Sequence, residues 1–132
     1  MFMNEAFRAE WSPRLLSVLR IVAALLFLQH GLTKLIGFPG PAPAALTLFP
    51  GYLSMTIEIV GSLLLLVGLF TRQAAFILSG EMAVAYFYAH QPRSLFPMNN
   101  GGSLAILYCF VFLYLCFAGA GPWSIDSQRA QR

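Results

Sequence analysis

Six ionisable side chains lie inside or at the edges of apolar segments of this 132-residue chain: Arg20, His30, Lys34, Glu58, Glu81 and His90. Charges at membrane depth are costly, so they usually face the inside of a helix bundle or a water-filled cavity. Acids beside lysine and histidine can bind a polar ligand or transfer protons, because histidine readily changes its charge near neutral pH. The six residues therefore predict a polar site inside a helix bundle, without naming its ligand.

The composition indicates a membrane protein. Hydrophobic residues make up 58% of the chain and charged residues only 10%, whereas soluble domains contain about 25% charged residues. A chain this short cannot bury so much apolar surface in a core of its own, and a lipid bilayer would cover the remainder. The net charge of +3 is modest and the arginines are spread singly, which argues against a nucleic-acid partner.

Four apolar segments are predicted to be helices of a single membrane domain that comprises residues 1–132. Their approximate bounds are 14–38, 52–70, 74–90 and 103–118, with short polar tails at both ends. At 1.5 Å per residue, the first helix can cross a hydrocarbon core of about 30 Å. We interpret it as a retained helix and not as a signal peptide, because His30 and Lys34 interrupt its apolar run.

The arginines outside the helices predict the orientation. The side that holds both termini carries Arg8, Arg14, Arg72, Arg129 and Arg132, and the opposite side carries Arg93 alone. Because positive charge accumulates in cytoplasmic loops, both termini are predicted to be cytoplasmic. The predicted fold is an all-α integral membrane protein, a four-transmembrane-helix bundle.

Helical spacing predicts which of the six side chains meet. His30 and Lys34 are four residues apart and share a helix face. Together with Glu58, Glu81 and His90 they lie within roughly 14 Å of the outer surface at 1.5 Å per residue. The simplest arrangement faces His30 and Lys34 toward both acids, so that the charges neutralise one another. Two interpretations stay open: a site for a ligand or for protons, and ion pairs that only fix the helix register.

Other polar and sulfur-containing residues are expected to be structural. Arg20 is expected to reach the cytoplasmic surface or to form an ion pair with Asp126 in the C-terminal tail. Cys109 and Cys116 are seven residues apart, about 10 Å along a helix, which exceeds the reach of a disulfide. They have no neighbouring histidine or acid in sequence, so packing is predicted and no metal site.

Five motifs, in their order and spacing, resemble the DoxX family of small membrane proteins from Arg14 to Asp126. They are residues 28–39 (LQHGLTKLIGFP), 58–69 (EIVGSLLLLVGL), 81–83 (EMA), 96–102 (FPMNNGG) and 119–126 (GAGPWSID). The resemblance implies a four-helix protein that passes several times through the bacterial inner (plasma) membrane. The family is named after a subunit linked to a terminal quinol oxidase and to thiosulfate:quinone oxidation, and other members look like partners of detoxifying redox enzymes.

Matched by position, the family's polar signature consists here of His30, Lys34, Glu58, Glu81, His90, Asn100, Gly101 and Gly102. The family often has an acid directly after the paired glycines, where this chain has Ser103. That departure weakens any role that needs a third carboxylate at the outer mouth.

The leading hypothesis is a redox-associated membrane subunit that binds a quinone or similar small molecule, as one subunit of a quinone-linked oxidoreductase. Glu81, Glu58 and His30 would handle protons, and Lys34, His90, Asn100, Gly101 and Gly102 would bind the substrate. No covalently bound cofactor, metal, haem or flavin is expected. The alternatives are a non-catalytic anchor for a soluble or membrane oxidoreductase and a small proton-coupled transporter that works as a homo-oligomer.

Overall fold

The computed structural model describes residues 3–132, and that part of the chain contains helices and loops but no strand. Four long helices pack together: α1 (Glu5–Ile36), α2 (Leu53–Val67), α3 (Thr71–Ala85) and α5 (Ser103–Ala118). Short helical turns connect or extend them: η1 (Leu48–Tyr52), η2 (Tyr86–His90), η3 (Gln91–Arg93), α4 (Pro97–Asn100) and α6 (Ile125–Ala130).

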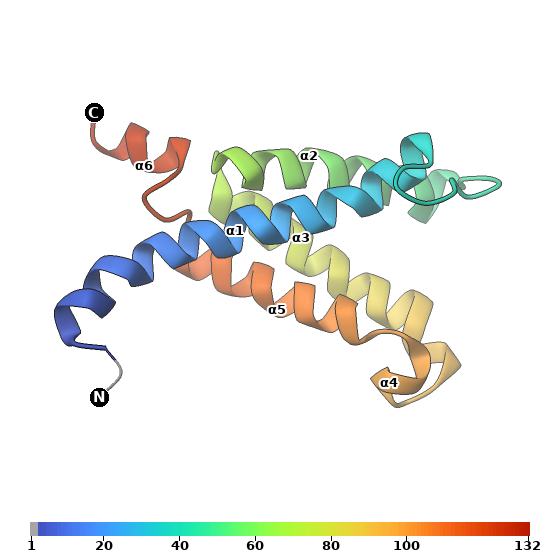
Figure 1. Ribbon diagram of the computed structural model, residues 1–132. Helices are drawn as coiled ribbons and strands as arrows, with labels where there is room; N and C mark the ends of the chain where they lie inside the picture. Colours follow the sequence, from blue (N-terminus) through green and yellow to red (C-terminus); the bar gives the residue numbers. More distant parts are fainter. Residues whose placement is uncertain (1–2) are drawn as a thin grey trace.

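The long helices form two pairs. Helix α1 packs along α2, and α3 packs along α5, while α2 and α3 join the pairs through a tight turn. The two pairs diverge toward the end that carries α4, as Figure 1 shows. We call this end the α4 end and the opposite end, where the C-terminal helix lies, the α6 end. The divergence leaves room between the pairs at the α4 end.

Local signals explain most helix ends. Glycines in the left-handed conformation end α1 at Gly37 (φ 68°) and α2 at Gly68 (φ 68°), a conformation that favours glycine. Helix α1 begins at Glu5, and the prediction of a polar tail up to Pro13 was wrong. The Asn4 side chain caps this helix by accepting a hydrogen bond from Phe7 N at 2.8 Å. Pro13 lies inside the exposed first turns, where water can bond the carbonyl that loses its donor.

The centre of the interior is apolar, and buried polar residues such as Arg20 and Glu58 lie toward its two ends. Phe27, Leu65, Leu78, Phe112 and Leu115 are at most 1% exposed and form its centre. Many large apolar side chains point outward instead, along every long helix. Two helical stretches, Glu5–Ile36 and Leu48–Val67, are long and apolar enough to cross a membrane, and Ser103–Ala118 is a shorter apolar helix. Such an outward apolar surface is typical of contact with lipid or with another protein.

Candidate functional site

A cavity of about 360 Å³ lies between the two helix pairs at the α4 end. All four long helices contribute to it, and so do η2 and the loop before α5. Its polar lining consists of His30, Glu58 and His90, and its other lining residues are Phe27, Met82, Ala85, Gly101, Leu104, Ala105 and Tyr108. The volume is within the usual range of small-molecule sites, roughly 300–1,000 Å³, and an apolar lining with a few polar groups is typical of them.

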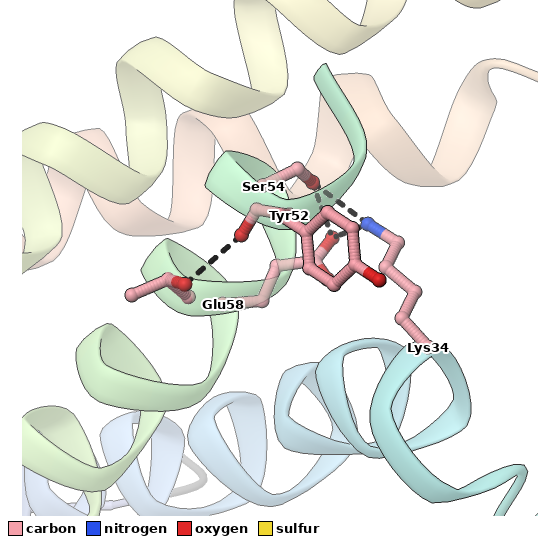
Figure 2. Close-up of polar contacts among 5 residues, drawn as sticks. Lys34, Tyr52, Ser54 and Glu58 are labelled. Carbon is pink, nitrogen blue, oxygen red and sulfur yellow. Dashed lines mark hydrogen bonds and ion pairs between the residues drawn. The ribbon is translucent and has the colours of Figure 1, made fainter. Parts of the chain in front are cut away.

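Lys34 joins α1 to α2 beside this cavity. Its Nζ lies 2.7 Å from Glu58 Oε1 and 2.7 Å from Ser54 Oγ, and the Ser54 hydroxyl donates to the same Glu58 oxygen at 3.3 Å. Figure 2 shows Lys34 reaching across to both α2 side chains. The Glu58 side chain is only 5% exposed, and its other oxygen, Oε2, has no hydrogen-bond partner among residues 3–132. At the edge of the cavity, one oxygen of the Glu58 carboxylate is therefore hydrogen-bonded and the other is not.

Gly31 makes this contact possible. A Cβ atom at position 31 would lie 2.6 Å from Ile59 Cγ1 and 3.2 Å from Glu58 Cβ, closer than side-chain atoms pack. The absence of a side chain lets α1 approach α2 closely, as small residues do at membrane helix interfaces. Consequently Lys34, three residues after Gly31, reaches Glu58 on α2, and His30, directly before Gly31, lines the same cavity as Glu58.

His30 has an aromatic setting. Its ring lies 5.7 Å from the Phe27 ring and 6.0 Å from the Tyr108 ring, edge-on to the latter. The residue is exposed within the open cavity, and the described part of the chain offers its ring nitrogens no hydrogen bond. His30 is therefore free to bond a ligand in the cavity.

His90 and the segment that follows it form the other wall. His90 Nδ1 lies 3.0 Å from the Asn100 carbonyl oxygen, and its ring stacks on Tyr86. Asn100 is buried: its amide donates to Ser94 O at 2.9 Å, and its Oδ1 accepts from Gly102 N at 2.7 Å. Asn100 and Gly102 thus shape the loop, while His90 and Gly101 line the cavity itself.

Glu81 lies in a different cavity from the one with His30 and His90. This second cavity, about 240 Å³, lies between η1, α2 and α3, and Ser54 and Glu81 are its polar lining residues. The expected single site with both acids is thus divided between two cavities. Glu58 lines the first and Ser54 the second, and a hydrogen bond joins these two residues. Helix rotation determines this division, because α3 turns Glu81 toward η1 while Met82 and Ala85 face the first cavity.

Arg20 and Asp126 lie at the α6 end without forming an ion pair of their own. Arg20 is fully buried, and its guanidinium donates to four backbone carbonyls: Leu65 and Leu66 at the end of α2, and Ala120 and Trp123 in the tail. The Asp126 carboxylate accepts from Phe70 N and Thr71 N, both at 2.9 Å, where α3 begins. The positive Arg20 thus binds carbonyls at the C-terminal end of α2, and the negative Asp126 binds N–H groups at the N-terminal end of α3. The helix dipole favours both arrangements.

The Asp126 contact predicts a pH-dependent contribution to stability. Burial alone would raise its pKa, but hydrogen bonds from Thr71 and Phe70 and the charge of Arg129 hold the pKa below its ordinary value. A lowered folded-state pKa gives stability at neutral pH that is lost as the pH falls through that pKa. We expect Asp126→Ala to cost about 0.5–2 kcal/mol at neutral pH, as for other helix caps.

Unfolding in detergent across a pH series measures this cost. The difference between wild type and Asp126→Ala should shrink as the pH falls below about 3.9, the ordinary aspartate pKa. Glu10→Ala is the control, because the Glu10 carboxylate is exposed and pairs only with Arg14. A difference that persists unchanged in acid would mean that the carboxylate charge does not hold the tail.

Several residues of these sites were not predicted. Ser54 and Gly31 determine the Lys34–Glu58 geometry, and Ser17 holds the tail by accepting from Trp123 N at 3.1 Å. The signal for Ser54 was its position four residues before Glu58, on the same helix face. Cys109 and Cys116 are free thiols, and residues 3–132 contain no group of three metal-binding side chains.

Comparison with known proteins identifies the family to which the chain belongs. The DoxX family model matches residues 15–91. A protein of Haemophilus influenzae described only as uncharacterized is 46% identical over 129 residues, covering 90% of this chain and 93% of its own length. A second uncharacterized protein of that organism is 29% identical, covering 85% of this chain and 81% of its own length. No solved structure matches. The chain is thus a membrane protein that belongs to the DoxX family.

Proposed function

We propose that this protein spans the inner membrane four times, with cytoplasmic termini, and binds a quinone-like molecule in the cavity between its helix pairs. Support for the orientation comes from the α6 end, which carries Arg72 and the arginines of both tails, against Arg93 at the α4 end. Support for four spans comes from the outward apolar side chains on all four long helices.

The observation that carries the proposal is the pairing of flat and polar surfaces in one cavity. Phe27 and Tyr108 form a largely buried aromatic wall of this cavity, and their ring centroids are 4.9 Å apart. Beside them lies the His30 imidazole, whose ring nitrogens make no hydrogen bond among residues 3–132. Glu58 of α2 also lines the cavity, and its Oε2 atom has no hydrogen-bond partner in that part of the chain. A planar ring with oxygens at its edge satisfies both kinds of surface, and an aromatic pocket with a few fixed polar groups suits it.

The redox setting rests on the family resemblance. Oxidation of a quinol releases protons as well as electrons, and His30, His90 and Glu58 are the groups at the cavity that would take up protons. The electrons would pass to a partner oxidoreductase, so the chain would act as its membrane subunit. Glu81 lies in the neighbouring cavity without a hydrogen bond to these groups, so it has no part in this proposal.

Replacement of His30 by phenylalanine tests the cavity. Phenylalanine keeps the aromatic packing against Phe27 and Tyr108 and removes only the ring nitrogens. We expect His30→Phe to weaken binding of a short-chain ubiquinone analogue about tenfold, the equivalent of one hydrogen bond of roughly 1.4 kcal/mol. Isothermal titration calorimetry in mild detergent measures this, with thermal stability recorded alongside.

Glu10→Gln serves as the control, because Glu10 is exposed in the first turns of α1, far along the helix from the cavity. It should bind like wild type. Equal binding by His30→Phe and wild type would contradict the role of His30. A stable wild-type protein that binds no quinone would favour the alternative function, an anchor for a partner enzyme.

A further inference from the structure

The cavity that contains Glu81 is chemically unlike the first one. Its lining comes from η1 (Phe49, Pro50), α2 (Leu53, Ser54, Ile57) and α3 (Ile77, Gly80, Glu81, Val84). Phe49, Leu53, Ile77 and Val84 are exposed on the outward surface of these helices. The cavity is therefore an apolar pocket that opens on the outward side of the bundle, with a carboxyl group among its walls.

The Glu81 carboxyl lacks a partner in the protein. Both of its oxygens are inaccessible to solvent, and neither has a hydrogen-bond partner among residues 3–132. Ser54, the other polar lining residue, donates its single hydroxyl proton to Glu58. Buried polar groups are almost always hydrogen-bonded, and an unpaired carboxylate in apolar surroundings is especially costly.

The local charges are also unbalanced. Lys34 and Glu58 are the charged groups close enough to act on Glu81, and these two already form an ion pair at 2.7 Å. One lysine can balance only one of the two glutamates, so without a ligand the buried Glu81 carboxyl keeps its proton as a neutral acid. An ammonium group in the second cavity would pair with the ionised carboxylate.

We propose that the second cavity is a separate binding site for a hydrophobic amine, whose ammonium group pairs with Glu81 and whose apolar body lies along Phe49, Leu53, Ile77 and Val84. The cavity matches both parts of such a molecule, because Glu81 in its lining suits the ammonium group and the apolar residues around its opening suit the apolar body. This site is distinct from the quinone-like site of the proposed function and does not depend on it.

Labelling with dicyclohexylcarbodiimide tests the site in the wild-type protein. This apolar reagent adds across its C=N bond to a protonated carboxyl group, and the adduct rearranges to a stable N-acylurea with no leaving group. Peptide mass analysis should find the label on Glu81, and Glu81→Gln should lose it. N,N-dimethyldecylamine, a tertiary amine that forms no stable amide, is the probe.

The amine should protect Glu81. At roughly ten times its Kd it should slow labelling about tenfold, because protection scales as one plus the ratio of probe concentration to Kd. Decanol, with a similar tail and no charge, should protect much less. His30→Phe should be protected like wild type, which separates this test from that of the quinone-like site. Label on other carboxyls only, no protection, or equal protection by decanol would each overturn the proposal.

Discussion

Replacing Arg20 by methionine is expected to be among the most destabilising changes in this chain. The guanidinium donates to four carbonyls, and Arg20 is fully buried. Methionine fills much of the same volume but donates no hydrogen bond. Each buried carbonyl left without a donor costs roughly 1–3 kcal/mol. Leu65 O keeps a hydrogen bond from Gly68 N, so three carbonyls lose their donor. The tail carbonyls lie near the surface, where water can replace part of the loss, and we therefore expect a cost of about 3–5 kcal/mol in the free energy of unfolding, at the lower end of that range.

Unfolding in detergent measures the Arg20 effect. Arg14→Met, which removes the same side chain from the same helix, is the matched control. Arg14 makes an ion pair with the exposed Glu10, and such pairs contribute about 0–1 kcal/mol. Arg20→Lys should recover only part of the stability, because an ammonium group cannot reproduce the planar fork of donors. Similar losses for Arg14→Met and Arg20→Met would show that the buried network does not hold the tail to α2.

Removal of Lys34 is expected to have the second large effect. Lys34→Met leaves the buried Glu58 carboxylate without its cation, with only Ser54 as donor. Removing one partner of a buried ion pair costs about 3–5 kcal/mol. Because Lys34 is 28% exposed, we expect a smaller cost of about 2–3 kcal/mol.

A double-mutant cycle with Glu58→Gln checks the cause. The neutral glutamine carries no buried charge, so Lys34→Met should cost much less in a Glu58→Gln background, with a coupling within the usual range of about 0.5–3 kcal/mol. Ser54→Ala is a useful third variant, since it removes the hydroxyl and leaves the ion pair. Additive costs for Lys34→Met and Glu58→Gln would mean that the pair contributes nothing to stability.

The sequence predicted the Lys34–Glu58 contact because depth and helical spacing restrict both residues. Lys34 is four residues after His30, and both were expected at the height of Glu58. The all-helical fold was confirmed for the described residues. The last long helix begins at Ser103 and ends at Ala118, which are the predicted bounds.

Helix rotation and loop geometry could not be predicted in the same way. The membrane depth of a residue does not say toward which neighbour its side chain points. The packing of α3 against the other helices decides that Glu81 lies apart from His30 and His90. The partners of Arg20 are carbonyls whose positions depend on how residues 119–124 turn, with positive φ at Gly119 and Gly121. The length of α1 was missed because Pro13 argues against a helix, whereas the Asn4 cap lies earlier in sequence.

The most direct test of the central claim is mass analysis of the small molecules that remain bound to the protein after extraction in mild detergent. Wild type, His30→Phe and Glu10→Gln should be compared at equal, verified folding. We expect a quinone with wild type and Glu10→Gln, and its loss from well-folded His30→Phe. A wild-type protein without any bound ring compound, or the same compound in equal amount on His30→Phe, would contradict a ligand site between the two helix pairs.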